Sequence, residues 1–213
     1  MGAETSVEVY PLLARGVFAT YGYFVVDAAS GHALLIDPGA QADLFLKAIR
    51  EKMWTVEAVL LTHGHFDHMG AANALRDALD VPILAHTQAT RYLENPELNL
   101  SASHGLDIRV QGVVTFEHGA SIPLANGKVF LEVAHVPGHT DDSCAFLLRK
   151  EGIAFVGDTV YEGGPGLTVF PTGDECALRK GIESRLLTLP EDTLLLSGHS
   201  QPTTVHQLRR AIA

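Results

Sequence analysis

The segment from Thr62 to His68 reads Thr-His-Gly-His-Phe-Asp-His and contains four side chains that can bind a metal ion. His63 and His65 are two positions apart, so in an extended segment they project on the same side and can chelate one ion. Asp67 and His68 then turn toward a second position. Imidazole and carboxylate ligands together suit zinc, iron or manganese. The segment therefore predicts a metal centre.

Three more potential ligands stand next to a glycine, at strand ends or in a loop between strands: His139 after Gly138, Asp158 after Gly157 and His199 after Gly198. Ligands commonly gather at the carboxyl ends of strands in open α/β sheets, so we expect these side chains to meet the first four. Seven donors without a cysteine exceed the needs of one tetrahedral ion and fit two ions that share a carboxylate. Any one of these histidines alone would more simply be a loop residue with satisfied hydrogen bonds.

The elements that must position these donors alternate between short apolar runs and segments of helical period. Strands are predicted at residues 21–26, 33–36, 56–61, 81–85, 113–116, 128–133, 144–148, 153–156 and 193–197. Helices are predicted at 42–52, 71–79, 87–93, 175–189 and 204–212, and residues 95–112 are predicted to form a long loop. Strands and helices that interleave in this way indicate sheets covered by helices in layers.

The motif His-x-His-x-Asp-His, followed by distant His, Asp and His residues, resembles the metallo-β-lactamase superfamily. The resemblance covers nearly the whole chain, from Asp37 in Ile-Asp-Pro-Gly to His199 in Ser-Gly-His. It implies a single domain over residues 1–213 with an α/β (α+β) fold, the four-layer αββα sandwich. In that fold two mixed β-sheets pack face to face, helices lie outside, and the metals sit at one edge.

The resemblance also implies a role for each donor. The expected ligands of the first metal are His63, His65 and His139, and those of the second are Asp67, His68 and His199. Asp158 matches the carboxylate that bridges both ions, and Asp37 matches a buried aspartate that supports the site. Asp67 and Asp158 are the expected catalytic residues. The expected cofactors are two divalent ions, with zinc favoured and iron or manganese as the alternatives.

Within the superfamily, the nearest resemblance is to short, single-domain relatives of hydroxyacylglutathione hydrolase (glyoxalase II). It rests on the segments 137–140, 157–158, 170–174 and 189–190. Two features depart from the full-length enzymes: the chain stops at Ala213 without a helical C-terminal extension, and the loop 162–167 lacks the arginine of a Gly-Arg pair. We therefore expect a thioesterase or esterase for small substrates that has no strong preference for glutathione thioesters.

The mechanism that this resemblance implies is attack of a metal-bridging hydroxide on a carbonyl carbon, since two cations lower the pKa of water from about 15.7 toward about 7. Three alternatives stay open. One is an oxidoreductase like the persulfide dioxygenases, which would hold one iron through His63, His139 and Asp158. The others are a lactonase and a metal-binding module without turnover. The lactamase branch usually has no aspartate bridging its metals, so Asp158 argues against it.

Composition restricts the partners. The net charge of −10 and the lack of long Lys or Arg runs disfavour nucleic acid as a substrate. No run of about eighteen apolar residues predicts a transmembrane helix, and the N-terminus has neither the basic nor the apolar region of a signal peptide, so we expect a cytoplasmic protein. Cys144 and Cys176 lie far apart and are expected to be reduced thiols. The expected partner is a small-molecule substrate, and nothing in the sequence indicates an oligomeric state.

The remaining histidines are expected to have other roles. His86 and His135 lie near the motif strands and are expected to be structural or to support the ligands. The others are expected to be surface or loop residues: His32, His104, His118 and His206. Tyr161, three residues after Asp158, either packs in the core or donates a hydrogen bond to a substrate carbonyl.

Overall fold

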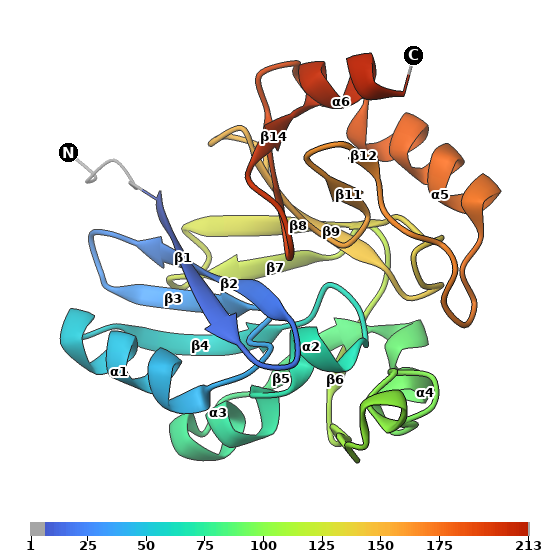
Figure 1. The fold of residues 1–213 in the computed structure, drawn as a ribbon. Coiled ribbons are helices and arrows are strands. Elements are labelled where there is room, and N and C mark those ends of the chain that lie inside the picture. The colour runs from blue at the N-terminus through green and yellow to red at the C-terminus, as the bar shows by residue number, and fades with distance from the viewer. Residues whose placement is uncertain (1–6, 213) are drawn as a thin grey trace.

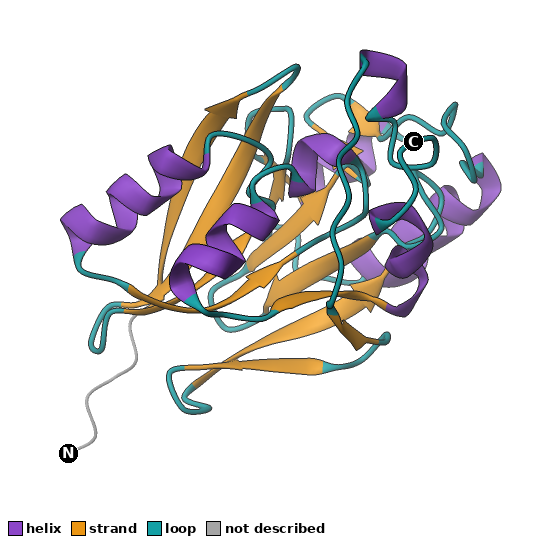
Figure 2. Cartoon of the chain, turned by 90° about the horizontal axis from the view of Figure 1, so that it is seen from below, coloured by secondary structure: helices purple, strands orange, loops and turns teal. Residues whose placement is uncertain are grey.

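Two six-stranded β-sheets face each other with helices on their outer surfaces, in a computed structural model that describes residues 7–212 (Figures 1 and 2). The fold class expected from the sequence is confirmed. The first sheet has the order β1-β2-β3-β4-β5-β6, from β1 (Val7–Arg15), β2 (Ala19–Asp27), β3 (His32–Ile36), β4 (Thr55–Leu60), β5 (Ile83–His86) and β6 (Val114–Phe116). Strands β1 to β3 are antiparallel, and β3 to β6 are parallel.

The second sheet has the order β14-β13-β10-β9-β8-β7. Its strands are β7 (Ser121–Leu124), β8 (Val129–His135), β9 (Cys144–Leu148), β10 (Ile153–Gly157), β13 (Leu194–Ser197) and β14 (Thr203–Thr204). Only the β10–β13 pair is parallel among these. A separate two-stranded ribbon joins β11 (Val160–Tyr161) to β12 (Gly164–Pro165).

Helices cover the outer face of each sheet (Figure 1). On the first sheet lie α1 (Ala42–Lys52) and α3 (Ala72–Leu79), and on the second lie α5 (Glu175–Gly181) and α6 (Val205–Ala211). Two short helices, α2 (Phe66–Met69) and α4 (Thr90–Leu93), belong to the loops at one edge. None of the helices within residues 7–212 combines the length and apolar character that a membrane-spanning helix requires.

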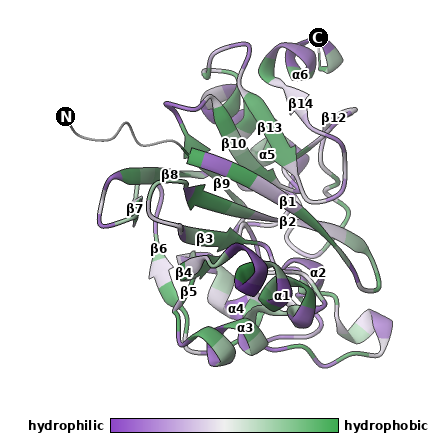
Figure 3. Ribbon diagram, turned by 90° about the vertical axis from the view of Figure 1, so that its left-hand side faces the viewer, coloured by the Kyte–Doolittle hydropathy of each residue, from purple (hydrophilic) through white to green (hydrophobic). Residues whose placement is uncertain are grey.

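Three apolar layers alternate with the sheets and helices. Phe24 on β2 packs toward α1, whereas the next residue, Val25, packs between the two sheets. Successive side chains of a strand point to opposite faces, so a central strand covered on both faces must be apolar at nearly every position. Figure 3 shows this as continuous hydrophobic colour along the inner strands. The third layer lies between the second sheet and the helices α5 and α6.

The structure differs from the predicted elements where local apolar signals are weak. Strand β1 was not predicted, because its residues are mostly half-exposed at a sheet edge and include Pro11, which edge strands tolerate. The short strands β7, β11, β12 and β14 were also missed. The predicted helix 175–189 is shorter: α5 ends at Gly181 and continues as the π-helical turn Ile182–Leu186. The predicted loop 95–112 contains the 3₁₀ turn Ala102–His104.

Parallel strand pairs in both sheets bring the predicted donors to one edge. Strands β3 and β4 are parallel, so Asp37 and His63, which follow them, leave the first sheet on the same side. Strands β10 and β13 are also parallel, so Asp158 and His199 leave the second sheet together. His139 follows from the loop between β8 and β9. Because parallel strands place their carboxyl ends together, this edge collects side chains that are far apart in the sequence.

Candidate metal centre

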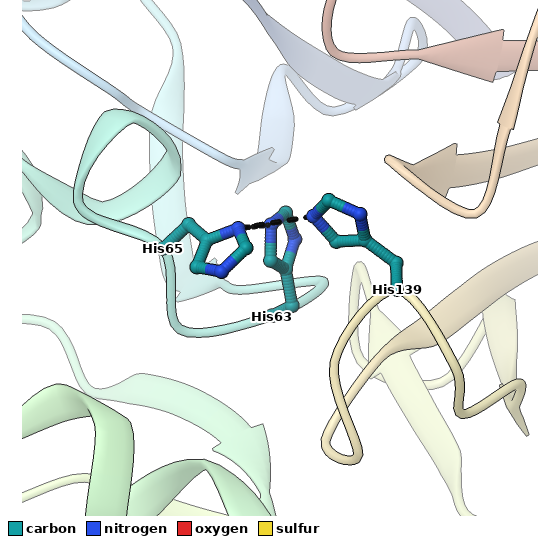
Figure 4. A group of neighbouring side chains, drawn as sticks. All are labelled: His63, His65 and His139. Atoms are coloured by element: carbon teal, nitrogen blue, oxygen red, sulfur yellow. Dashed lines mark hydrogen bonds between the residues drawn. The ribbon is translucent and has the colours of Figure 1, made fainter. Parts of the chain in front are cut away.

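His63, His65 and His139 form a first group of potential metal ligands, and all three side chains are buried (Figure 4). The Nδ1 atom of His65 lies 3.1 Å from Nε2 of His63 and 3.0 Å from Nε2 of His139. Ligands of a tetrahedral zinc at 2.0–2.1 Å are about 3.3 Å apart, which is close to this spacing. One Nδ1 proton cannot serve two neighbouring acceptors at once, so a cation fits this arrangement of nitrogens.

Asp67, His68 and His199 form a second group. Oδ2 of Asp67 lies 3.0 Å from Nε2 of His199, and the Nε2 atoms of His68 and His199 are 3.3 Å apart. The two groups point in different directions because the chain is extended at His65, which caps α2 with φ −72° and ψ 143°, and then turns into that helix. The local change from extended chain to helix therefore separates the two sets of donors.

Asp158 lies between the two groups. Its Oδ1 atom is 3.2 Å from Nε2 of His68, and its Oδ2 atom is 3.3 Å from Nε2 of His199 and 3.7 Å from Nε2 of His139. The carboxylate thus contacts donors of both groups and is almost fully buried. The structure brings all seven predicted site residues together at one position.

In four of the five histidines, the Nδ1 atom of the ring contacts another group of the protein that holds the ring in place. The contacts are His63 Nδ1 with Thr62 Oγ1 (3.1 Å), His68 Nδ1 with Asp37 Oδ2 (2.9 Å), His139 Nδ1 with the Leu167 carbonyl (2.7 Å) and His199 Nδ1 with the Ala19 carbonyl (3.0 Å). Such contacts orient a ligating imidazole and leave Nε2 free to face an ion. The residues therefore fit two divalent ions.

Asp37 occupies the supporting position that the resemblance implied. It is buried at the end of β3, where Oδ1 accepts a hydrogen bond from the Thr62 backbone N–H at 2.8 Å. Its Oδ2 accepts from the Thr62 hydroxyl at 2.6 Å and contacts His68 Nδ1 at 2.9 Å. One carboxylate therefore fixes both the start of the donor segment and one histidine of the second group.

Electrostatics of the first group and of Asp158 suit a cation. In the second group burial lowers the histidine pKa values, but Asp158 and the neighbouring aspartates outweigh it and raise the pKa of His68 well above its ordinary value and that of His199 to about 9, so these two imidazoles carry protons when no metal ion is bound. Burial lowers the pKa of His63 well below its ordinary value, and burial together with His139 lowers the pKa of His65 to about 3. Burial alone would raise the pKa of Asp158, but His68 and His199 outweigh it and hold that pKa well below its usual range. The first group is therefore neutral at pH 7, the form in which imidazole binds metal, and the bridging position carries a negative charge.

Glycines beside the donors permit the close approach of the two sheets. Gly157 has φ +50°, and a Cβ atom there would lie 2.3 Å from Oγ1 of Thr62. A Cβ atom at Gly198 would lie 2.4 Å from Cε1 of His68. A side chain at Gly198 would displace the donor His68, and one at Gly157 would displace Thr62, which contacts His63 and Asp37. These contacts explain the glycine next to Asp158 and His199.

Cys144 takes no part in the site. It is buried in β9, where its Sγ lies 3.2 Å from the Thr62 carbonyl oxygen, and burial raises its pKa well above the ordinary value. A buried thiol of raised pKa is inert as a nucleophile. Cys176 is exposed, and both cysteines are free thiols, as expected.

A cavity of about 470 Å³ opens over the donors and contains residues that sequence reasoning did not assign to the site. Besides the donors and Tyr161, its lining includes Phe18, Phe66, Leu100, Ser103, His104, Leu167 and Phe170. Val17 and Phe18 are exposed apolar residues in the turn between β1 and β2. The sequence predicts no strand at β1, so it gives no turn at these residues.

The structure places His104 and Tyr161 in the lining of this cavity. His104 is exposed, as expected for a loop histidine, but it also lines the cavity, with its ring centroid 5.2 Å from those of Phe18 and Phe66. Tyr161 lines the cavity with its ring 6.4 Å from that of His199. Burial and the nearby Asp158 raise the pKa of Tyr161, so the phenol keeps its proton and can donate it in a hydrogen bond.

His86 and His135 lie outside the donor groups and support the fold, as expected. Their rings stack with centroids 4.1 Å apart, and Nε2 of His135 contacts the Asp141 carbonyl oxygen at 2.8 Å, in the loop that carries His139. His118 is exposed and its Nδ1 accepts a hydrogen bond from the His135 backbone N–H. His32 and His206 pair with Glu57 and Glu191.

The neutral His86 predicts a pH-dependent contribution to stability. Burial, with His135 and His118 nearby, lowers the pKa of His86 from about 6.5 to about 4. A depressed histidine pKa stabilises the fold above the unfolded value near 6.5, and this contribution is lost as the pH falls toward 4. Between pH 7 and pH 4 the free energy of unfolding falls in both proteins, and we expect this fall to be about 1–2 kcal/mol smaller in His86→Asn than in the wild type. Asparagine keeps an acceptor for the Gln88 backbone N–H, which His86 Nδ1 accepts in the wild type. Urea denaturation of both metal-free proteins measures this, and parallel pH profiles would contradict it.

Residues 15–199 match the model of the metallo-β-lactamase superfamily. The chain is 33% identical over 183 residues to hydroxyacylglutathione hydrolase GloC of Haemophilus influenzae, covering 84% of this chain and 85% of that one. Among solved structures it resembles BLEG-1 B3 metallo-β-lactamase, with TM-score 0.86, 32% identity and 94% and 95% of the two chains covered. It also resembles TTHA1623 in a di-iron-bound form, with TM-score 0.83, 31% identity and coverage of 95% and 98%.

Proposed function

Because the chain belongs to the metallo-β-lactamase superfamily, we propose that it is a two-metal hydrolase that cleaves a small thioester or ester. The observation that carries this proposal is the position of Asp158, whose carboxylate contacts His139 of the first donor group and His68 and His199 of the second. A carboxylate shared in this way serves two ions better than one. The similarity to hydroxyacylglutathione hydrolase GloC supports a thioester as the substrate class.

The proposed ligands are those in the two groups, with His63, His65 and His139 for one ion, Asp67, His68 and His199 for the other, and Asp158 for both. Two divalent ions bound there supply an activated water at neutral pH and polarise a carbonyl oxygen. Zinc is our proposed metal, and iron is the alternative because the similar TTHA1623 has a di-iron-bound form.

The chain's own residues then orient the substrate and handle the proton. Asp67 is partly exposed on the cavity wall, with its Oδ2 atom 3.0 Å from Nε2 of His199. Besides binding the second ion, its carboxylate would orient the attacking water and accept its proton. Tyr161 offers a phenol hydrogen to the substrate carbonyl or to the departing group. Phe170, whose ring lies 5.3 Å from that of His65, excludes water from one side.

A panel assay on protein loaded separately with zinc, iron or manganese tests this proposal. The panel contains an uncharged thioester, lactoylglutathione, a lactone and a β-lactam, and an oxygen electrode follows a reaction with glutathione persulfide. We expect two ions per chain, hydrolysis of a thioester or ester, and no oxygen uptake. Oxygen uptake with a single iron would instead assign a persulfide dioxygenase. A strong preference for the lactone or for the β-lactam would assign a lactonase or a lactamase.

A further inference from the structure

We propose that the substrate places an apolar, uncharged chain, such as a straight acyl or alkyl chain, against an aromatic wall beside the metal centre. This inference rests on the proposed function and names its substrate class. The aromatic wall consists of Phe18, Phe66 and His104. Their ring centroids are 6.0 Å apart for Phe18 and Phe66, and 5.2 Å for each phenylalanine with His104.

The aromatic wall is fixed relative to the reacting atoms. Phe66 stands between the donors His65 and Asp67 in the sequence, and its side chain is buried. Its backbone N–H donates a hydrogen bond to the Asn99 carbonyl oxygen at 2.9 Å. The ring of Phe66 then holds Phe18 and His104, which come from two other segments. An acyl chain that lies on these rings would therefore keep a constant position relative to its own carbonyl carbon.

Two apolar side chains from another loop, Leu167 and Phe170, also line the cavity. The Leu167 carbonyl accepts from His139 Nδ1 at 2.7 Å, which fixes this loop against the metal centre. The ring of Phe170 lies 5.4 Å from that of His139. A flexible chain that lies against these apolar side chains loses contact with water, which is the source of its binding energy.

The exposed rim of the cavity is apolar. It is formed by two lining residues, Phe18 (46% exposed) in the turn between β1 and β2 and Leu167 (54% exposed) in the loop after β12. Exposed apolar residues that gather at a cavity mark a binding surface more often than single scattered ones. A chain longer than the cavity would continue over this rim.

Charge argues for an uncharged group in the same place. The lining of the cavity within the described chain includes no lysine or arginine. The acidic side chains there are Asp67 and Asp158, and the histidines His65, His139 and His199 are proposed to be neutral metal ligands. A substrate with free carboxylates would find no cation along the aromatic wall, where a selective site normally supplies one.

A series of uncharged thioesters with acyl chains from two to eight carbons on N-acetylcysteamine tests the inference. Burial of each methylene is expected to raise kcat/KM by about two- to fourfold until the cavity and rim are filled. Lactoylglutathione is expected to be a poorer substrate than the octanoyl thioester. Hydrolysis that is independent of chain length, or a preference for the glutathione thioester above about a hundredfold, would overturn the inference while leaving the hydrolase assignment intact.

Two matched variants separate the wall from general effects on the surface. Phe18→Ser removes an exposed aromatic ring from the cavity, and Phe130→Ser removes one of similar exposure (46% and 53%) from β8, in a separate hollow beside Lys128 and Arg149. We expect Phe18→Ser to lower the ratio of octanoyl to acetyl kcat/KM about tenfold. Phe130→Ser is expected to leave this ratio unchanged. Equal ratios in both variants would overturn the role of the wall.

Binding provides a readout that does not depend on turnover. Calorimetry of the metal-loaded protein with butanoate, hexanoate and octanoate is expected to give a dissociation constant that falls with each added methylene. This decrease should be weaker in Phe18→Ser than in Phe130→Ser. If no thioester or ester is cleaved but the dissociation constants follow this order, the proposed reaction fails and the apolar subsite stands. Dissociation constants that do not change with chain length would refute the subsite directly.

Discussion

Replacing Asp158 with alanine is expected to lower kcat/KM about a thousandfold and to reduce the bound metal in parallel. The reason is geometric, because its two carboxylate oxygens contact His68 on one side and His199 and His139 on the other. Without this carboxylate, the second donor group loses a negative charge, and the metal ion proposed for the first group loses a potential fourth ligand. Metal analysis by mass spectrometry and steady-state kinetics on one preparation of each protein measure the two losses together.

The control for Asp158→Ala is His118→Ala. His118 is exposed after β6, belongs to neither donor group and is absent from the cavity lining within the described residues. Wild-type metal content and activity are expected for it. His104→Ala is not a neutral control, because His104 packs on Phe18 and Phe66 in the cavity, and a smaller loss with full metal content is expected. Equal losses for Asp158→Ala and His118→Ala would mean that the metal centre lies elsewhere.

Asp37→Asn is expected to weaken metal binding by about 10- to 100-fold without unfolding the protein. Asparagine has nearly the same shape and tolerates the left-handed backbone at this position, where φ is +50°. However, the Asp37 carboxylate accepts a hydrogen bond from the Thr62 hydroxyl and contacts His68 Nδ1. The N–H group of an asparagine amide in that place would face two groups that themselves donate hydrogen bonds. His68 would lose the partner that orients it and raises its basicity. Competition with a chelator of known affinity measures the change, and excess metal should restore much of the activity.

Asp27→Asn is the matched control for Asp37→Asn. Asp27 is another fully buried aspartate, at the end of β2, which runs antiparallel to β3 and so ends at the edge of the sheet away from the metal centre. Its Oδ2 accepts from the Ser30 hydroxyl in a turn. We expect its replacement to change stability but not metal affinity. If both variants bind metal as tightly as the wild type, Asp37 does not support the site.

The predicted strands succeeded where burial on both faces leaves a continuous apolar run. Residues 33–36, 144–148 and 153–156 are such runs, and the structure has the strands β3, β9 and β10 there. Strand β1 is different because it is an edge strand whose residues are half-exposed, and its pairing from Val7 with Asp27 to Arg15 with Ala19 is visible only in the sheet. The end of α5 at Gly181 likewise has no local signal, since the apolar spacing continues through Ile182 and Leu186.

In the candidate site, too, some residues could be predicted from the sequence and others could not. The donor segment could be predicted because His63, His65, Asp67 and His68 are close in the sequence and their types are specific to metal binding. The distant donors could be predicted because each stands beside a glycine at a strand end or loop. Among the groups that orient these ligands, only Asp37 could be predicted, and that prediction came from the resemblance to the superfamily. The carbonyl oxygens of Leu167 and Ala19 carry no sequence signal at all, because every residue has one.

The sequence by itself determined the superfamily and the layered fold and predicted the metal ligands, because these depend on residue types, short spacings and runs of apolar residues. Only the tertiary structure decided what surrounds the metal centre. Phe18, His104 and Phe170 belong to three separate segments, and none of them has a side chain that indicates a function when taken alone. They form an apolar cavity because parallel strands in both sheets end at one edge and bring their loops together there. The proposed substrate selection therefore depends on contacts between distant segments, whereas four of the seven proposed metal ligands lie in the short segment from His63 to His68.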